Sequence, residues 1–242
     1  MLNGTKLYDD ERVPAILFWK RFLDKENCKN AVFCLGNSSS IVGVLQEGIK
    51  IEGQRVLVNY NAGSMGDDIT EAIGAAVYDN ERIIYTITGD GSVMMNLQEF
   101  QTIRHYDFNI KTIIFNNDGY GAIRATCSRY FNGIYTGCDK DSGISFPDFS
   151  RIADAFEIKY RRCCCIGELD EAIDWIIKED GPLILEIMQR IDEIPSFRLE
   201  SIMNENGEFV TAPLHDLSPR LGKEILNKYK YKKCKWRNLW KN

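Results

Sequence analysis

The chain has 242 residues, of which 44% are hydrophobic and 27% charged, and its net charge is −5. This composition is ordinary for a soluble globular protein, and the acidic balance argues against nucleic acid as a main partner. No uninterrupted apolar run approaches the roughly 20 residues that cross a bilayer, and the first ten residues lack the plan of a signal peptide. We therefore expect a cytoplasmic protein with no transmembrane segment.

The eight cysteines do not follow a metal-binding pattern. The sequence contains no Cys-x-x-Cys pair, and only His105 and His215 could add imidazole ligands. A zinc or iron–sulfur site is therefore not expected. Reduced, partly buried thiols are the simplest interpretation.

Two periodicities alternate along the chain. Short apolar runs indicate buried strands, and segments with apolar residues three and four positions apart indicate helices. Their alternation predicts an α/β fold, with a doubly wound, mostly parallel sheet that has helices on both faces. The predicted strands are residues 31–35, 56–60, 82–88, 110–115, 158–164 and 182–187, and the predicted helices are residues 8–24, 41–46, 67–78, 93–105, 168–178 and one that starts at residue 147.

Two segments depart from this alternation. Residues 121–138 are aromatic and lack a clear period, which suits a mobile lid or an interface segment. After a domain of residues 1–190, residues 191–242 are expected to form an extended tail with a turn at 204–207. The tail ends in a basic, aromatic stretch, which is either solvated or docked on a partner, or else contacts an anionic membrane surface or nucleic acid.

Polar loops follow two of the predicted strands. Gly89-Asp90-Gly91-Ser92 ends strand 82–88, and Asn116-Asn117-Asp118-Gly119 follows strand 110–115. Parallel strands bring such loops to one edge of the sheet, where open α/β sheets bind their ligands. The glycines let the backbone approach a ligand, and Ser92 with the following helix N-terminus can hold a phosphate.

The two loops together offer oxygen ligands for a metal. The Asp90 carboxylate, the Asn117 amide oxygen and the Gly119 carbonyl would supply three ligands, and two phosphate oxygens and a water would complete the octahedron that Mg²⁺ prefers. The alternative is that Asp90 caps a helix and that Asn116-Asn117 forms a turn. Because the motifs are 117 − 90 = 27 positions apart, with a helix and a strand between them, the metal site is favoured.

Gly89-Asp90-Gly91, followed at this distance by Asn116-Asn117, resembles the thiamine diphosphate motif of the acetolactate synthase and pyruvate decarboxylase superfamily. The resemblance extends over roughly residues 14–221. It implies the fold of the C-terminal, diphosphate-binding domain of these enzymes, with thiamine diphosphate and Mg²⁺ as cofactors. It assigns the metal to Asp90, Asn117 and Gly119.

The same resemblance implies further cofactor contacts. Gly63-Ser64-Met65-Gly66 is similar to the loop whose bulky apolar residue props thiamine in its bent shape. Met65 would be that residue, with ordinary core packing as the alternative, and the Gly63 carbonyl would accept from the 4′-amino group. The implied cofactor-binding residues are Gly36, Asn37, Ser38, Gly63, Ser64, Met65, Gly89, Asp90, Gly91, Ser92, Asn117, Gly119, Tyr120 and Gly121.

The chain differs from the family in its extent. The family's enzymes also have a pyrimidine domain, whose glutamate activates the cofactor, and a middle domain that can bind flavin. Nothing in this sequence matches either, so the chain is expected to be inert alone and to bind no flavin. A partner chain with a pyrimidine domain, or a missing N-terminal portion, would bring the activating glutamate. The expected assembly is a hetero-oligomer, such as a dimer of heterodimers.

A second difference concerns the substrate. Pyruvate decarboxylases carry a glutamate four residues after the equivalent of Gly119, where this chain has Ile123. The resemblance thus favours an enzyme that decarboxylates a 2-oxoacid and ligates the enamine to a second carbonyl. Arg124 is a possible contact for a substrate carboxylate or phosphate, or else forms a surface or interface salt bridge. A two-chain 2-oxoacid decarboxylase and a non-catalytic binding or regulatory homologue are the alternatives.

Overall fold

A computed structural model describes residues 11–191, 193, 198–204, 206–211, 217–221 and 223–229. The chain divides into two compact units, residues 1–193 and residues 194–242, and each is considered by itself. Parts of the expected tail, residues 212–216 and the basic end from residue 230, lie outside the described residues. The domain boundary expected at residue 190 stays a prediction.

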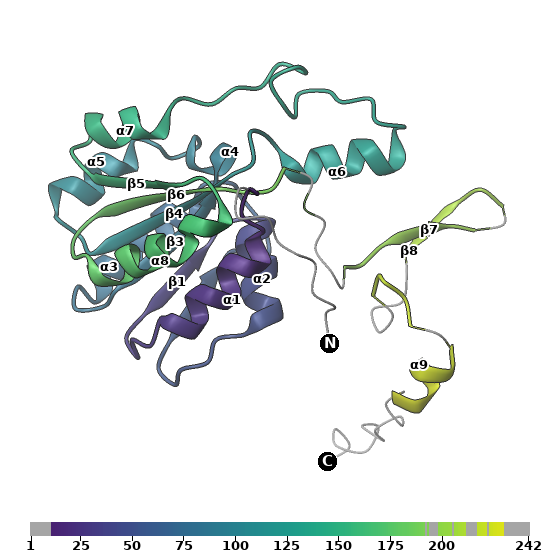
Figure 1. Ribbon diagram of the computed structural model, residues 1–242, viewed down its shortest axis with the longest axis horizontal. Helices are drawn as coiled ribbons and strands as arrows, with labels where there is room; N and C mark the ends of the chain where they lie inside the picture. The colour runs from purple at the N-terminus through teal and green to yellow at the C-terminus, as the bar shows by residue number, and fades with distance from the viewer. Residues whose placement is uncertain are drawn as a thin grey trace, which may run out of the picture. The chain divides into compact units, whose positions relative to one another are not determined.

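The first unit is built on a six-stranded sheet in the order β2-β1-β3-β4-β6-β5, in which all neighbours are parallel (Figure 1). The chain passes from β1 outward to β2 and then returns to place β3 on the other side of β1. A topological switch point therefore lies between β1 and β3. The strands are β1 Val32–Leu35, β2 Arg55–Val58, β3 Ile84–Gly89, β4 Ile110–Asn116, β5 Lys159–Cys163 and β6 Leu183–Met188.

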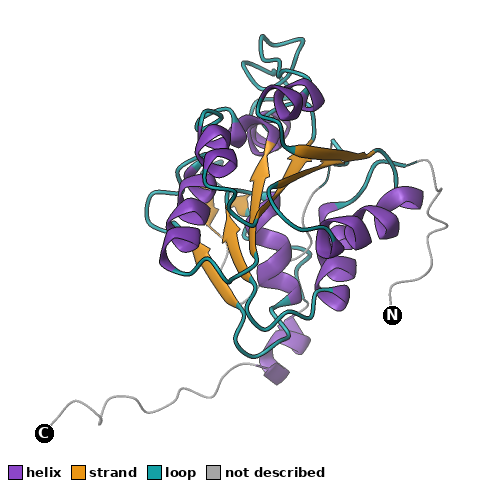
Figure 2. Cartoon of the chain, turned by 90° about the vertical axis from the view of Figure 1, so that its left-hand side faces the viewer, coloured by secondary structure: helices purple, strands orange, loops and turns teal. Residues whose placement is uncertain are grey.

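Helices cover both faces of the sheet, which confirms the predicted fold class (Figure 2). On one face α1, α2 and α8 pack in a core that includes Trp19, Val44 and Ile173. On the other face α3, α5 and α7 pack in a core that includes Ile69 and Phe149. The helices of this unit are α1 Ala15–Lys25, α2 Ser39–Glu47, α3 Asp67–Tyr78, α4 Asp90–Val93, α5 Glu99–His105, α6 Gly121–Tyr130, α7 Phe149–Ala155 and α8 Leu169–Lys178.

The central strands are buried on both faces. Every residue of β4 is buried, as is every residue of β3 except its last, Gly89. Such near-continuous apolar runs are typical of parallel strands between two helical layers. The loops that leave these strands therefore start from the fully buried centre of the sheet.

Three predicted elements are wrong in part. The helix expected over residues 8–24 begins at Ala15, and Val13 instead forms a parallel bridge with Gln189; residues 8–10 lie outside the described part. The helix expected over residues 93–105 is interrupted by turns between α4 and α5, where the Asn96 side chain donates to the Gly66 carbonyl. The first half of the expected lid is the helix α6, which buries only Arg124 and Cys127 and so shows no apolar period.

The second unit contains a hairpin of β7 Ser201–Met203 and β8 Phe209–Thr211 and a helix α9 Lys223–Tyr229. The turn expected between Asn204 and Gly207 is confirmed, since the Gly207 amide donates to the Asn204 carbonyl. Among the helices that the structure describes in either unit, none has the length and apolar character to cross a membrane.

Candidate functional site

A pocket of about 560 Å³ lies at the carboxyl ends of β1, β3 and β4. Its position at the switch point between β1 and β3 is the usual ligand position in an open α/β sheet, and its volume lies within the range of small-molecule sites. The pocket is lined by Asn37, Ser38, Ser39, Ser40, Gly63, Met65, Gly89, Asp90, Gly91, Ser92, Met95, Phe115, Asn117, Gly119, Tyr120, Gly121, Ala122, Ile123 and Gln189.

Asp90 is the buried acid of the pocket. It is the first residue of α4, and only 2% of its surface is exposed. Its Oδ1 accepts from the amide of Gly91 (2.7 Å), and its Oδ2 accepts from the amides of Asn117 (3.1 Å) and Gly119 (3.0 Å). Burial raises the pKa of Asp90 to about 6, although the three amides favour the carboxylate. The loops after β3 and β4 are thus joined through one carboxylate.

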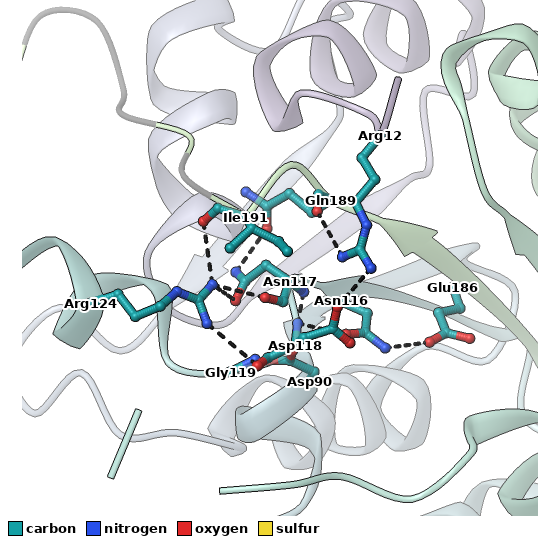
Figure 3. A network of polar contacts seen from close by, with 10 residues as sticks. All are labelled: Arg12, Asp90, Asn116, Asn117, Asp118, Gly119, Arg124, Glu186, Gln189 and Ile191. Carbon is teal, nitrogen blue, oxygen red and sulfur yellow. Dashed lines mark hydrogen bonds and ion pairs between the residues drawn. The ribbon is translucent and has the colours of Figure 1, made fainter. Parts of the chain in front are cut away.

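Asn117 is held from two sides (Figure 3). Its Oδ1 accepts from Nη2 of Arg124 (2.9 Å), and its Nδ2 donates to Oε1 of Gln189 (3.3 Å). Arg124 also donates to the Asn117 carbonyl (2.8 Å), and only 7% of the Arg124 surface is exposed. Arg124 does not line the pocket, and its burial shows that the surface salt bridge considered from the sequence is wrong.

Gly119 stands where no side chain fits. Its φ of +154° is in the region that favours glycine, and a Cβ there would lie 2.1 Å from the Cys138 carbonyl oxygen and 2.4 Å from Nη1 of Arg124. The preceding residue, Asp118, also has a positive φ, of +57°. The loop after β4 is therefore a tight turn that turns backbone amides towards Asp90.

The N-terminus of α2 forms a further wall of the pocket. Ser38, Ser39 and Ser40 line the pocket here, and α6 also begins at the pocket, with Gly121. Helix N-termini attract anions such as phosphate. Two buried oxygens in this wall, Ser40 Oγ and Asn37 Oδ1, have no hydrogen-bond partner among the described residues. An anionic ligand with hydroxyl groups or bound water would satisfy them.

Gly89 and Gly91, at the end of β3, are glycines for different structural reasons. A Cβ at Gly91 would lie 2.1 Å from the ring of Tyr120, so the packing of Tyr120 requires glycine there. At Gly89 a Cβ would meet no protein atom closer than 3.9 Å. Since the chain itself does not require glycine at position 89, its bare backbone is available to a ligand in the pocket.

Twelve of the fourteen cofactor-binding residues implied by the sequence line this pocket, and Gly36 and Ser64 do not. Gly36 is buried at the end of β1, where its amide donates to the Ile87 carbonyl, and Ser64 is exposed. The Gly63 carbonyl accepts from Nδ2 of Asn37. Gln189 was not predicted from the sequence, although it directly follows β6 just as Asn117 directly follows β4.

Residues 40–187 match the family described as thiamine pyrophosphate enzyme, C-terminal TPP binding domain, where thiamine pyrophosphate is another name for thiamine diphosphate. The chain belongs to this family. The structure and the match agree, because the matched segment starts at the N-terminus of α2 and ends in β6, and so contains most of the pocket.

Acetolactate synthases are among the similar proteins. The large subunit from Cyanidium caldarium is 32% identical over 145 residues, which are 60% of this chain and 24% of that protein. The isozyme 2 large subunit of Escherichia coli (strain K12) is 28% identical over 141 residues, 58% of this chain and 25% of that protein. A probable chloroplastic acetolactate synthase 2 of Oryza sativa subsp. japonica is 31% identical over 191 residues, 76% of this chain and 28% of that protein. The chain therefore spans about a quarter of these relatives and is an acetolactate synthase-like domain.

Proposed function

We propose that this chain supplies the diphosphate-binding half of an acetolactate synthase-like enzyme that acts on a 2-oxoacid. The observation that carries the proposal is the meeting of the loops after β1, β3 and β4 around Asp90, within a segment that matches a thiamine pyrophosphate family. Asp90, Asn117 and Gly119 would hold Mg²⁺ through oxygen atoms, which suit this hard cation.

The remaining lining residues fit the other parts of thiamine diphosphate. The N-terminus of α2, with Ser38 and the partnerless Ser40 Oγ, would bind the diphosphate. Met65 would support the bent cofactor, and the Gly63 carbonyl would orient its aminopyrimidine. When bound, thiamine diphosphate supplies the carbon nucleophile for cleavage next to a ketone, and the chain orients it.

The described lining of the pocket contains no glutamate that could activate the cofactor. Asp90 and Tyr120 are its only ionisable side chains among the described residues, and Asp90 already accepts hydrogen bonds from three backbone amides. We therefore propose that the activating glutamate comes from a pyrimidine domain on a partner chain or on a further part of the polypeptide. A separate partner would make the enzyme a hetero-oligomer, such as a dimer of heterodimers. A cytoplasmic location also stays a prediction.

Carbonyl ligation is the favoured outcome of the reaction. Ile123 lines the pocket at the start of α6, and 46% of its surface is exposed. The pyruvate decarboxylases that the sequence resembles carry their proton-donating glutamate at this position. An apolar side chain cannot protonate the decarboxylated product, so we propose that the product is joined to a second carbonyl compound.

Calorimetry tests the cofactor assignment. With a pyrimidine-domain chain present, thiamine diphosphate should bind to the purified chain only when Mg²⁺ is added. Asp90→Ala should abolish this binding. Asp170→Ala is the matched control, because its half-exposed carboxylate pairs with Arg21 and does not line the pocket. Binding that survives Asp90→Ala would refute the assigned site.

Product analysis tests the reaction. The chain, a pyrimidine-domain chain, thiamine diphosphate and Mg²⁺ are incubated with a 2-oxoacid such as pyruvate. A hydroxyketone product supports ligation. An aldehyde alone would show a two-chain decarboxylase, and the absence of turnover with every pyrimidine-domain chain would show a non-catalytic homologue.

A further inference from the structure

Glu186 is a buried carboxylate that the pocket does not use directly. It lies in β6, between β4 and β5, and 1% of its surface is exposed. Its Oε2 accepts from Nε of Arg162 (2.7 Å) and from the Tyr160 hydroxyl, and its Oε1 accepts from Nδ2 of Asn116 (2.6 Å). Figure 3 shows this last contact at the base of the loop after β4.

The contact with Glu186 decides how the Asn116 amide is oriented. A carboxylate only accepts hydrogen bonds, so the NH₂ group of Asn116 must face it and Oδ1 must face the backbone. Oδ1 of Asn116 indeed accepts from the amide of Asp118 (2.9 Å). This side-chain-to-backbone turn supports the positive φ of Asp118.

The supported turn aims the next amides at the pocket acid. With Asp118 held, the amides of Asn117 and Gly119 both reach Oδ2 of Asp90, at 3.1 and 3.0 Å. The order of contacts is thus Glu186 to Asn116, Asn116 to the turn, and the turn to Asp90. The first two steps are one hydrogen bond each and the third is two, and all four bonds are shorter than 3.2 Å.

We propose that Glu186 is a positioning residue for the loop that carries Asn117 and Gly119. A buried carboxylate with a cationic partner is seldom better for stability than apolar side chains of equal volume. Here Glu186 acts by orienting a neighbour. It fixes the one orientation of the Asn116 amide in which Oδ1 is left to accept from the turn. The step from this loop to the cofactor rests on the proposed function, and the step from Glu186 to the loop does not.

Glu186→Gln tests the orientation with almost no change in volume. Glutamine has one accepting oxygen, and the side with Arg162 and Tyr160 offers two donors, one of them charged. The glutamine NH₂ then faces the NH₂ of Asn116, which must turn over and lose its bond to Asp118. Asn116→Ala removes the same connection without touching Glu186, and serves if the first variant does not fold.

Glu26→Gln is the matched control. Glu26 is also a buried carboxylate, 3% exposed, that accepts from a tyrosine hydroxyl, that of Tyr85, and from a backbone amide. It lies at the end of α1, and Tyr85 is near the start of β3, away from the pocket. This control should lower stability without altering the loop.

Two measurements separate the inference from the proposed function. Amide hydrogen exchange of Asn117 and Gly119, followed by NMR without cofactor, should be at least about tenfold faster in Glu186→Gln and unchanged in Glu26→Gln. Affinity for thiamine diphosphate with Mg²⁺ should fall by about 10–100-fold in Glu186→Gln alone, as for other groups that orient metal ligands. Unchanged exchange, or faster exchange with wild-type affinity, would overturn the proposal. If the wild type binds no thiamine diphosphate, the proposed function fails and exchange alone decides the role of Glu186.

Discussion

The guanidinium of Arg124 donates to the side-chain oxygen of Asn117 at 2.9 Å, and this is the oxygen proposed to bind Mg²⁺. A metal ion at that oxygen would repel the guanidinium. Asp90 and a bound diphosphate would together carry more negative charge than the metal neutralises, so the site as a whole would still attract Arg124. We therefore expect Arg124 to keep its place behind Asn117 when cofactor and metal bind.

Replacement of Arg124 should destabilise the fold. Its acceptors among the described residues are five uncharged oxygens, four of them backbone carbonyls of Asn117, Asp118, Cys138 and Ile191. Arg124→Met removes the donor and leaves these oxygens buried, which should lower the free energy of unfolding by about 2–4 kcal/mol. Denaturant unfolding measures the change.

The control for this variant is an arginine of another helix. Arg151 is exposed in α7, and Arg151→Met should change the free energy of unfolding by less than about 0.5 kcal/mol. Equal losses of unfolding free energy in the two variants would mean that the hydrogen bonds of Arg124 to these carbonyls contribute no more to stability than an exposed arginine does.

Gly119→Ala should be among the most damaging single-methyl changes in the chain. The new Cβ would lie 2.1 Å from the Cys138 carbonyl oxygen, and backbone cannot move aside as a flexible side chain can. We expect a loss of about 3 kcal/mol or more in the free energy of unfolding. Gly133 also has a positive φ, of +74°, but open space around it, so Gly133→Ala should cost only about 1–2 kcal/mol from its backbone conformation. Similar thermal midpoints for the two variants would contradict the steric argument.

The central part of the fold could be predicted from the sequence because its signals are local. The β3 and β4 segments are continuous apolar runs that lie between two helical layers, and α8 has a clear apolar face. Helix α6 could not be recognised in this way, because its buried positions are an arginine and a cysteine. The interruption between α4 and α5 coincides with a contact from Asn96 to Gly66, 30 residues away, which periodicity does not reveal.

The same limit applies to the site. The meeting of Asp90 and Asn117 could be predicted, since consecutive parallel strands often pair and their carboxyl ends then share an edge. Gln189 and Glu186 could not be placed, because β6 inserts between β4 and β5 although β5 precedes it in the chain. Strand order is set by packing over the whole sheet. A single sequence reveals which strands are neighbours only where the loops after two strands carry residues of one site.

Asp68 should make stability depend on pH in the cofactor-free chain. This residue of α3 is fully buried, and its Oδ1 has no partner among the described residues. Burial raises the pKa of Asp68 to about 7. The acidic Glu71 nearby adds to this rise, whereas the hydrogen bond from Thr86 to Oδ2 opposes it. The Cys34 thiol also lies close to Asp68. The folded chain thus keeps a proton that the unfolded chain releases near pH 4, so the free energy of unfolding should fall as pH rises from about 4 to about 7.

Asp68→Asn isolates this contribution. The amide cannot ionise, so the variant should lose that part of the pH dependence and exceed the wild type in stability above pH 7, by up to about 4 kcal/mol. Urea unfolding at pH 4, 5.5 and 7.5 provides the comparison. Parallel stability curves for the two proteins would show that Asp68 is not protonated in the folded state.

Ile123→Glu should redirect the proposed reaction towards an aldehyde. The new carboxyl group would stand in the pocket in the first turn of α6, at a position that is 46% exposed, so the fold should tolerate it. As a proton donor it would compete with the second carbonyl compound for the decarboxylated product. With a pyrimidine-domain chain present, the ratio of aldehyde to hydroxyketone should rise by at least about tenfold, a part of the roughly 10²–10⁴-fold that general acid catalysis contributes. Ile134→Glu, at a position 70% exposed that does not line the pocket, should leave the ratio unchanged. An unaltered ratio in Ile123→Glu would mean that position 123 does not select between the two outcomes.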